Sequence, residues 1–252
     1  MQKLSKIYRK DYRGEDVIVE RIYKDSSWNP RAEFVPKAFN FTPENPWAVV
    51  IGNGTSRLHY NLNNFLDYRE GNFANWKPAS IKRKFYTYGC NAIFRDYIVD
   101  FLAITGEGLL DEYVSAEAKD NVIAYANNQF LYRHPSKFSL IPQNPNLNSG
   151  AIAAYLAAFD GHKKVFLLGF DGNDTLNYNY NVYASTPYYP KLNETVQEDF
   201  WVQSLCEIMK VYADTEFVRV MPTTSFRIPE AWKYFTNFRQ IDYTQFTSEV
   251  GL

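Results

Sequence analysis

The stretch WAVVIGNGTSRLHY, residues 47–60, decides the fold expected for this chain. Its first five residues are apolar at consecutive positions, as in a strand that both faces of a parallel sheet bury. The apolar run stops at Gly52 and Gly54 and then resumes with residues that suit a helix. A glycine-rich turn between a strand and a helix presents backbone N–H groups to an anion, so we expect residues 52–56 to bind a phosphate. A plain tight turn is the alternative.

Apolar runs alternate with longer amphipathic segments along the rest of the chain, a pattern typical of βα units. We therefore predict an α/β fold that is Rossmann-like and doubly wound, with a mostly parallel sheet and helices on both faces. The expected strands are residues 47–52, 84–90, 97–105, 121–126, 163–170 and 215–221. The expected helices are residues 56–69, 107–119, 148–161 and 194–214.

The 252 residues suffice for one α/β domain with elaborations. Residues 1–46 mix charges and prolines without a long apolar period, so we interpret them as an N-terminal extension. Residues 47–252 are then the Rossmann-like nucleotide-binding domain. Within it, residues 172–192 are polar, rich in Tyr and Asn, and longer than most connections in compact domains. Their tyrosines favour a lid.

Charge and hydropathy exclude several kinds of partner. The formal net charge is −1, so no overall basic field attracts nucleic acid or an anionic membrane. No apolar stretch approaches the ~20 residues of a membrane span, and the first residues lack the apolar centre of a secretory signal. Cys90 and Cys206 lie in apolar runs, which suits buried, reduced thiols. We expect a soluble, cytoplasmic protein, and nothing in the sequence indicates its oligomeric state.

The predicted sheet also indicates where a ligand binds. Ligands of open parallel sheets bind beyond the carboxyl ends of the strands, close to the point where the strand order reverses. Residues 52–56, 90–91, 105–108 and 171–174 are expected to meet there. The helix at 148–161 adds the free amides of Ser149 and Gly150, which attract a phosphate or carboxylate. We expect this helix start and residues 52–56 to form one anion-binding hollow.

Three segments of this region carry a resemblance to known proteins: VVIGNGTS, YGCNAIF and LNSGAIAAYLAAFDGHKKVFLLGFD. In order and spacing they resemble the nucleotide-binding core of the bacterial sialyltransferase family that includes the lipooligosaccharide enzymes. They also resemble a wider Rossmann-like group, with archaeal 6-hydroxymethylpterin pyrophosphokinases and flagellin-glycosylation proteins. The resemblance covers roughly residues 47–175. It implies a nucleotide-sugar-dependent glycosyltransferase that works by direct displacement, with a nucleotide phosphate as the leaving group.

The resemblance also implies roles for single residues. It places Asn53 and Asn91 on the phosphates and ribose of the nucleotide, and Ser149 with Gly150 near the acidic group of the donor. The complete set predicted to bind the nucleotide is Gly52, Asn53, Gly54, Thr55, Ser56, Asn91, Thr105, Ser149 and Gly150. The predicted catalytic set comprises Asp171 and Asp174, the nearest carboxylates, and the lid residues Tyr178 and Tyr180, which with Tyr183 could donate hydrogen bonds to a leaving phosphate.

The chain departs from the family pattern in two places. The family has an arginine shortly before the Ser-Gly pair, whereas this chain has NPNLN at residues 144–148. The family also has a catalytic histidine before the helix that follows the lid, whereas His162 is the last histidine here. We expect His162 at the surface or as a cap, at the end of the sheet away from the site. His59 and His134 have no position that favours general base catalysis.

Two other functions therefore stay open. A relative of the pterin pyrophosphokinases would use ATP and Mg²⁺, which Asp171 and Asp174 could hold. A binding or assembly protein that kept the nucleotide fold and lost catalysis is the other possibility. The leading hypothesis, a glycosyltransferase, requires no cofactor. Its donor is a nucleotide sugar, and the acceptor is not indicated by the sequence.

Overall fold

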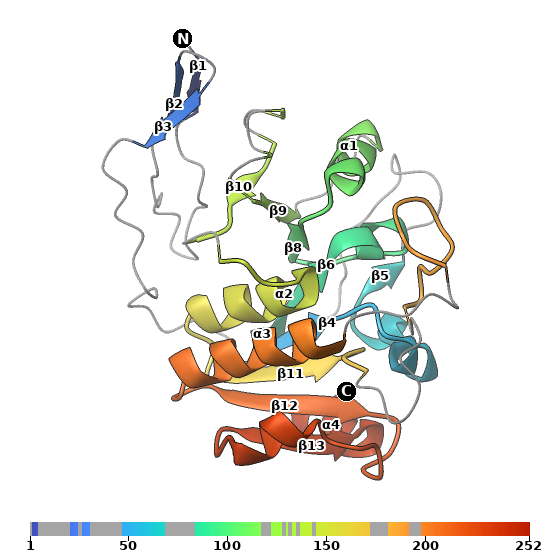
Figure 1. Ribbon diagram of the computed structural model, residues 1–252. Coiled ribbons are helices and arrows are strands. Elements are labelled where there is room, and N and C mark those ends of the chain that lie inside the picture. The colour runs from blue at the N-terminus through green and yellow to red at the C-terminus, as the bar shows by residue number, and fades with distance from the viewer. Residues whose placement is uncertain are drawn as a thin grey trace.

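A computed structural model describes residues 2–4, 21–24, 27–30, 47–68, 84–116, 122–127, 130, 133–134, 137–142, 145–171, 181–191 and 198–252. Its main body is an eight-stranded sheet in the order β10-β9-β8-β6-β4-β11-β12-β13 (Figure 1). Every neighbouring pair of strands in this sheet is parallel. The predicted Rossmann-like α/β fold is therefore confirmed.

All six predicted strands are present, and two more complete the sheet. The strands are β4 (Trp47–Ile51), β6 (Phe85–Cys90), β8 (Phe101–Ile104), β9 (Ile123–Ala126), β10 (Ser139–Leu140), β11 (Lys164–Leu168), β12 (Glu216–Met221) and β13 (Phe238–Asp242). The strand expected at 97–105 is divided, because the carboxylate of Asp100 accepts the Thr87 amide at 2.7 Å and its hydroxyl at 2.8 Å. The first part, β7 (Tyr97–Ile98), pairs instead with β5 (Asp67–Tyr68).

Three of the predicted helices are present as α1 (Glu107–Ser115), α2 (Ser149–Phe159) and α3 (Glu198–Val211). The helix predicted at 56–69 is wrong, because this segment forms two short 3-10 helices, η1 (Thr55–His59) and η2 (Leu62–Asn64), followed by β5. Asn61 is extended between them, and its side chain accepts the Asn63 amide at 3.2 Å. Such a local bond competes with a continuous helix. A further helix, α4 (Tyr243–Val250), was not predicted, and a capping box at Asp242 starts it.

Helices cover both faces of the sheet, as predicted. Val49 and Ile51 of β4 face one core cluster, while Ala48 and Val50 face the other. The first face carries η2, η4 (Asn91–Arg95), α1 and α4. The second face carries α2, α3 and η6 (Glu230–Tyr234), and Figure 1 shows α2 and α3 in front of the sheet. The strand order reverses between β4 and β11, which is where a ligand site is expected.

The first residues of the chain form a sheet of their own. β1 (Gln2–Leu4), β2 (Arg21–Lys24) and β3 (Ser27–Pro30) pair antiparallel and share no strand with the main sheet. The first strand of the main sheet begins at Trp47, the residue at which we placed the start of the Rossmann-like domain.

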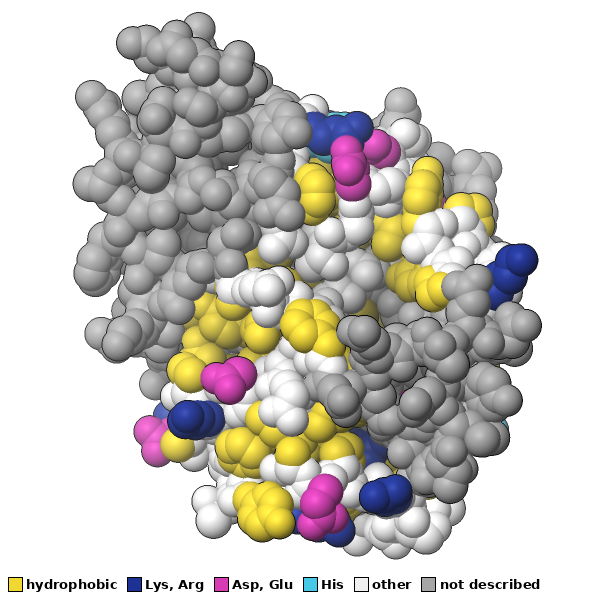
Figure 2. Space-filling view, in the orientation of Figure 1, with side chains coloured by type: hydrophobic (Ala, Val, Ile, Leu, Met, Phe, Trp, Pro, Cys, Tyr) yellow, Lys and Arg dark blue, Asp and Glu magenta, His cyan; other side chains and the backbone are white. Residues whose placement is uncertain are grey.

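The described helices include no membrane span, and one face of the surface carries charges of both signs (Figure 2). Among the described residues, none of the helices has both the length and the apolar character needed to cross a bilayer. Figure 2 shows that on the described part of the face carrying α2 and α3, most Lys and Arg side chains lie close to Asp and Glu side chains. This mixture agrees with the small net charge of the whole chain.

Candidate functional site

The glycine-rich loop after β4 is held against the end of β11. The amide of Gly52 donates to the carbonyl of Leu168 at 2.8 Å, and the amide of Gly54 donates to the carbonyl of Gly169 at 2.9 Å. Both amides are therefore occupied within the protein. The prediction that the amides of residues 52–56 face a phosphate does not fit this arrangement for these two groups.

Close approach of the two loops explains the glycines. A Cβ atom on Gly52 would lie 2.5 Å from the carbonyl oxygen of Gly169. A Cβ atom on Gly54 would lie 2.5 Å from Cγ of Asp171. Any side chain at these positions must push the loops apart, because backbone atoms cannot yield as a flexible side chain can. The tight structural turn therefore accounts for both glycines.

Asp171 closes the same loop. One carboxylate oxygen accepts the Ser56 amide at 2.9 Å and the Thr55 hydroxyl at 3.1 Å, and the other accepts a short hydrogen bond from the Ser56 hydroxyl. On the other side, Tyr243 at the start of α4 donates to the Ser56 carbonyl. The third loop amide is thus also occupied, and Thr55, Ser56 and Asp171 form one hydrogen-bonded group.

Phe170 separates the loop from the start of α2. Its buried ring lies so close to both that a Cβ atom on Gly52 would be 3.2 Å from it, and one on Gly150 would be 3.4 Å from it. The two segments lie at the same edge of the sheet, as expected, but an aromatic side chain fills the space between them. The expectation of one shared anion-binding hollow is wrong for this reason.

A second group of predicted residues does come together at the carboxyl ends of β6 and β8. The amide nitrogen of Asn91 donates to the Ser149 hydroxyl at 2.9 Å, and its oxygen accepts the Thr105 amide at 3.1 Å. Asn91 has φ 47, in the left-handed region that is uncommon for residues other than glycine. Its side chain therefore links two strand ends to the first residue of α2.

The start of α2 differs from the glycine loop in the state of its backbone amides. The side chain of Asn148 caps the helix by accepting the Ala151 amide at 2.8 Å. Within the described part of the chain, the amides of Ser149 and Gly150 donate no hydrogen bond, and both residues are partly exposed. Free amides at a helix start attract an anion through hydrogen bonds and the helix dipole. Among the predicted residues, this end of α2 is the best-formed anion site.

Asn53 connects the two groups. Its amide nitrogen donates to the Cys90 carbonyl and to the Tyr189 hydroxyl, both at 3.3 Å. The same hydroxyl accepts the Ala92 amide at 3.3 Å. Burial raises the pKa of Tyr189, so the hydroxyl remains protonated and retains a proton for another acceptor at this edge.

Arg57 is the functional-site residue that the sequence reasoning missed. Its side chain is only 2% exposed and donates to the Gly52 carbonyl at 2.8 Å and the Asn53 side chain at 2.9 Å. It also donates to the Tyr183 hydroxyl at 2.9 Å, and that hydroxyl donates to Asp96 at 2.6 Å. Arg57 therefore positions the glycine loop and part of the predicted lid. The only sequence signal was a cation directly after the GNGTS turn.

The thiol of Cys90 is not a nucleophile at neutral pH. It is buried beneath the site, and this burial raises its pKa to about 11. Because the thiolate is the reactive form, a thiol with so high a pKa is inert. The expectation that Cys90 and Cys206 are buried and free is confirmed.

None of the three histidines lies at the site. His59 is exposed on η1, and His134 bonds to Asp111 of α1 at 2.7 Å. His162 is fully buried, and its Nε2 lies 3.0 Å from the Tyr88 hydroxyl, which corrects the expected surface position. Its ring lies against aromatic strand residues, where burial is favourable.

Several predicted residues lie outside the described part of the chain, namely Asp174, Tyr178 and Tyr180. The described residues contain no group of three potential metal ligands. Asp171 is described, and it contacts hydroxyl groups and an amide within its own loop rather than a second carboxylate.

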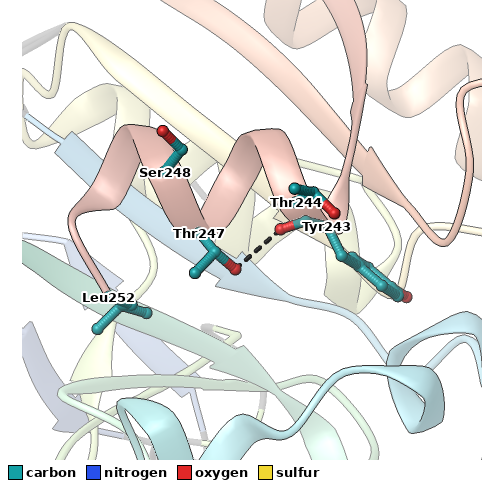
Figure 3. A pocket seen from close by; sticks show the side chains of 5 residues that line it. All are labelled: Tyr243, Thr244, Thr247, Ser248 and Leu252. Carbon is teal, nitrogen blue, oxygen red and sulfur yellow. Dashed lines mark hydrogen bonds between the residues drawn. The ribbon is translucent and has the colours of Figure 1, made fainter.

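A shallow cavity of about 410 Å³ lies beside α4. It is lined by Tyr243, Thr244, Thr247, Ser248 and Leu252, and Figure 3 shows four of these side chains along this short helix and that of Leu252 two residues after its end. None of these five side chains is charged, so the described wall offers an anion no cationic group. We assign no ligand to this cavity.

Comparisons of the chain with protein-family models, curated proteins and solved structures gave no match.

Proposed function

We propose that the protein binds the phosphate of a nucleotide sugar at the start of α2 and transfers the sugar to an acceptor. The observation that supports this proposal is the hydrogen bond of 2.9 Å between Asn91 and Ser149. This bond places two polar side chains beside the two free helix amides, at the edge where parallel sheets bind ligands. The proposal agrees with the resemblance to the bacterial sialyltransferases.

The transfer reaction suits such a site. The hydroxyl oxygen of the acceptor forms a bond to the sugar carbon, while the bond from that carbon to the phosphate oxygen breaks. The leaving phosphate keeps the electron pair, and the acceptor proton passes to a base. Fixed donors stabilise the charge that develops on the leaving oxygen, because they need no reorganisation during the reaction. Short polar side chains and helix amides provide this without a metal ion.

We assign the proton acceptor to Asp171, the described carboxylate that lies on the loop after β11. Its two oxygens offer about four acceptor sites, of which three are filled by Thr55 and Ser56. One site is left for the acceptor hydroxyl. Asp174, Tyr178 and Tyr180 remain predicted members of the same catalytic group.

A second candidate function is nucleotide binding without catalysis, as in an assembly protein. Two observations favour it: none of the histidines lies at the site, and Asp171 is already engaged by its own loop. A pyrophosphokinase would in addition need ATP and Mg²⁺. Proteins with these three functions share the same nucleotide-binding fold, and they differ in the products they form.

One experiment separates the candidates. Thermal shift is measured with CMP, CDP, UDP, GDP and ATP, where a nucleotide at ten times its dissociation constant stabilises the protein by about 1.4 kcal/mol. The sugar conjugate of the tightest nucleotide is then incubated with wild-type protein and with Asp171→Asn. Release of the free nucleotide by wild type alone supports the transferase. Binding without release supports the binding protein, AMP release from ATP with Mg²⁺ supports the kinase, and no shift with any nucleotide contradicts all three.

A further inference from the structure

Residues 181–191, the described part of the predicted lid, lie beyond the carboxyl ends of β4 and β6. Val182 donates to the Asn53 carbonyl at 2.8 Å, beyond β4. Arg95, beyond β6, donates to the Thr186 hydroxyl at 2.7 Å and to Glu112 of α1 at 2.7 Å. Because Arg95 binds both this segment and α1, the two are held in a fixed relation to each other.

Tyr188 of this segment combines a strained backbone with an exposed ring. Its φ is 68, in the left-handed region where a bulky side chain is an outlier. Its side chain is 64% exposed, so burial of the ring contributes little stability to offset the backbone strain. Strained residues persist where the surroundings over-determine them, and they concentrate at ligand sites. Tyr188 has these properties, whereas the neighbouring Tyr189 is partly buried and hydrogen-bonded.

Gly108 provides the space for this ring. A Cβ atom on Gly108 would lie 2.2 Å from Cε1 of Tyr188, so the ring lies against the first turn of α1 where a side chain is missing. Gly108 follows Thr105 by three residues, and the Thr105 amide donates to Asn91. The exposed ring therefore lies at the same edge of the sheet as the Asn91 and Ser149 site.

We infer that Tyr188 is the residue on which the planar base of the bound nucleotide stacks. This inference rests on the proposed function and adds the position of the base to it. Aromatic side chains stack on any base, because every base has a π face. The free amides at Ser149 and Gly150 hold the phosphate, and the Tyr188 ring holds the opposite end of the same ligand.

The test measures affinity by calorimetry for CDP, UDP, GDP and ADP, and for inorganic pyrophosphate, which lacks a base. Tyr188→Ala is expected to lower the affinity for the tightest-binding nucleotide by roughly 5- to 150-fold and to leave the affinity for pyrophosphate unchanged. Tyr188→Phe keeps the ring and is expected to restore most of the lost affinity. Gly108→Ala displaces the ring, and it is expected to lower nucleotide affinity without lowering the unfolding midpoint. Tyr234→Ala, at an exposed tyrosine of η6, is the matched control.

The outcomes separate this inference from the proposed function. If wild type binds a nucleotide and Tyr188→Ala binds it equally well, Tyr188 is not the stacking residue. Equal loss of nucleotide and pyrophosphate affinity in Tyr188→Ala also overturns the inference, because it shows a change in the phosphate site. If wild type binds neither the four nucleotides nor pyrophosphate, both the proposed function and this inference are wrong.

Discussion

Asn91 extends from the end of β6 to the first residue of α2, where its amide nitrogen lies 2.9 Å from the hydroxyl oxygen of Ser149. The same side chain accepts the Thr105 amide at the end of β8. One asparagine thus fixes three elements around the free amides at the helix start. Its left-handed backbone provides a way to test the side chain alone, because glycine adopts this conformation without strain.

Asn91→Gly is expected to weaken nucleotide binding by about 1 to 3 kcal/mol, the cost of losing one buried polar partner. The backbone at residue 91 remains relaxed in this variant. Isothermal titration measures the affinity, and urea unfolding shows whether the fold is retained. Asn91→Ala is the comparison variant, expected to lose additional stability through backbone strain. Unchanged affinity in Asn91→Gly would show that this side chain has only a structural role.

Gly54→Ala is expected to lower the free energy of unfolding by about 1 to 3 kcal/mol even without a nucleotide. The added Cβ atom would meet Asp171 at 2.5 Å and the Gly169 carbonyl at 2.6 Å. Gly106→Ala is the control, since the nearest atom to its Cβ is 3.4 Å away, and it is expected to lose less than about 1 kcal/mol. If Gly54→Ala has normal stability but no longer binds the nucleotide, the glycine loop binds the phosphate rather than serving only as a structural turn.

Arg57→Met is expected to destabilise the protein by about 2 to 4 kcal/mol, because three hydrogen-bond acceptors lose a buried donor. Denaturant unfolding measures this loss. Arg133→Met removes an arginine whose partners Glu107 and Asp111 are at the surface, and it is expected to cost less than about 1 kcal/mol. Equal effects of the two substitutions would mean that Arg57 does not position the loop.

Acid is expected to weaken a group of ion pairs at the other end of the sheet. Arg239 donates to Glu216 at 2.6 Å and to Glu249 at 2.8 Å, and Lys164 contacts both carboxylates. Hydrogen bonds from Arg239 lower the pKa of Glu249. Burial alone would raise the pKa of Glu216, but hydrogen bonds from Arg239 and Lys164 lower it overall.

Both carboxylates therefore have a lower pKa in the folded protein than in the unfolded chain, and their contribution to stability is complete above the ordinary Glu pKa of about 4.3. It is lost as the pH falls from there through the folded pKa. The urea midpoint is measured between pH 7 and pH 3. Glu216→Gln with Glu249→Gln is expected to flatten the acid decline. If the urea midpoint of this double variant falls with acid as steeply as that of the wild type, other carboxylates cause the loss of stability.

The fold was largely predictable, because β4 and β11 carry continuous apolar runs and β6 and β12 are mostly apolar. The error at residues 56–69 arose where the Asn61 side chain accepts the Asn63 amide, because such a local bond competes with a continuous helix. The C-terminal pair β13 and α4 was missed because β13 is mostly half-buried and lacks a continuous apolar run. Local patterns identify buried strands better than half-buried ones.

The site was predictable in position but not in detail. Strand ends follow from the fold, so the meeting of Asn91, Thr105 and Ser149 could be predicted. The role of the Gly52 and Gly54 amides could not, because it depends on how closely the β11 loop approaches. Phe170 looked like an ordinary strand residue, yet its ring fills the space between the loop and α2. Such contacts between distant segments have no local signal in the sequence.

The most direct test of the account is a crystal structure of the protein soaked with the nucleotide that gives the largest thermal shift. The expected result is phosphate density within hydrogen-bond distance of the Ser149 and Gly150 amides and of the Asn91 side chain. Phosphate density at the Gly52 to Ser56 loop or in the cavity beside Tyr243 and Leu252, with the start of α2 empty, would contradict it.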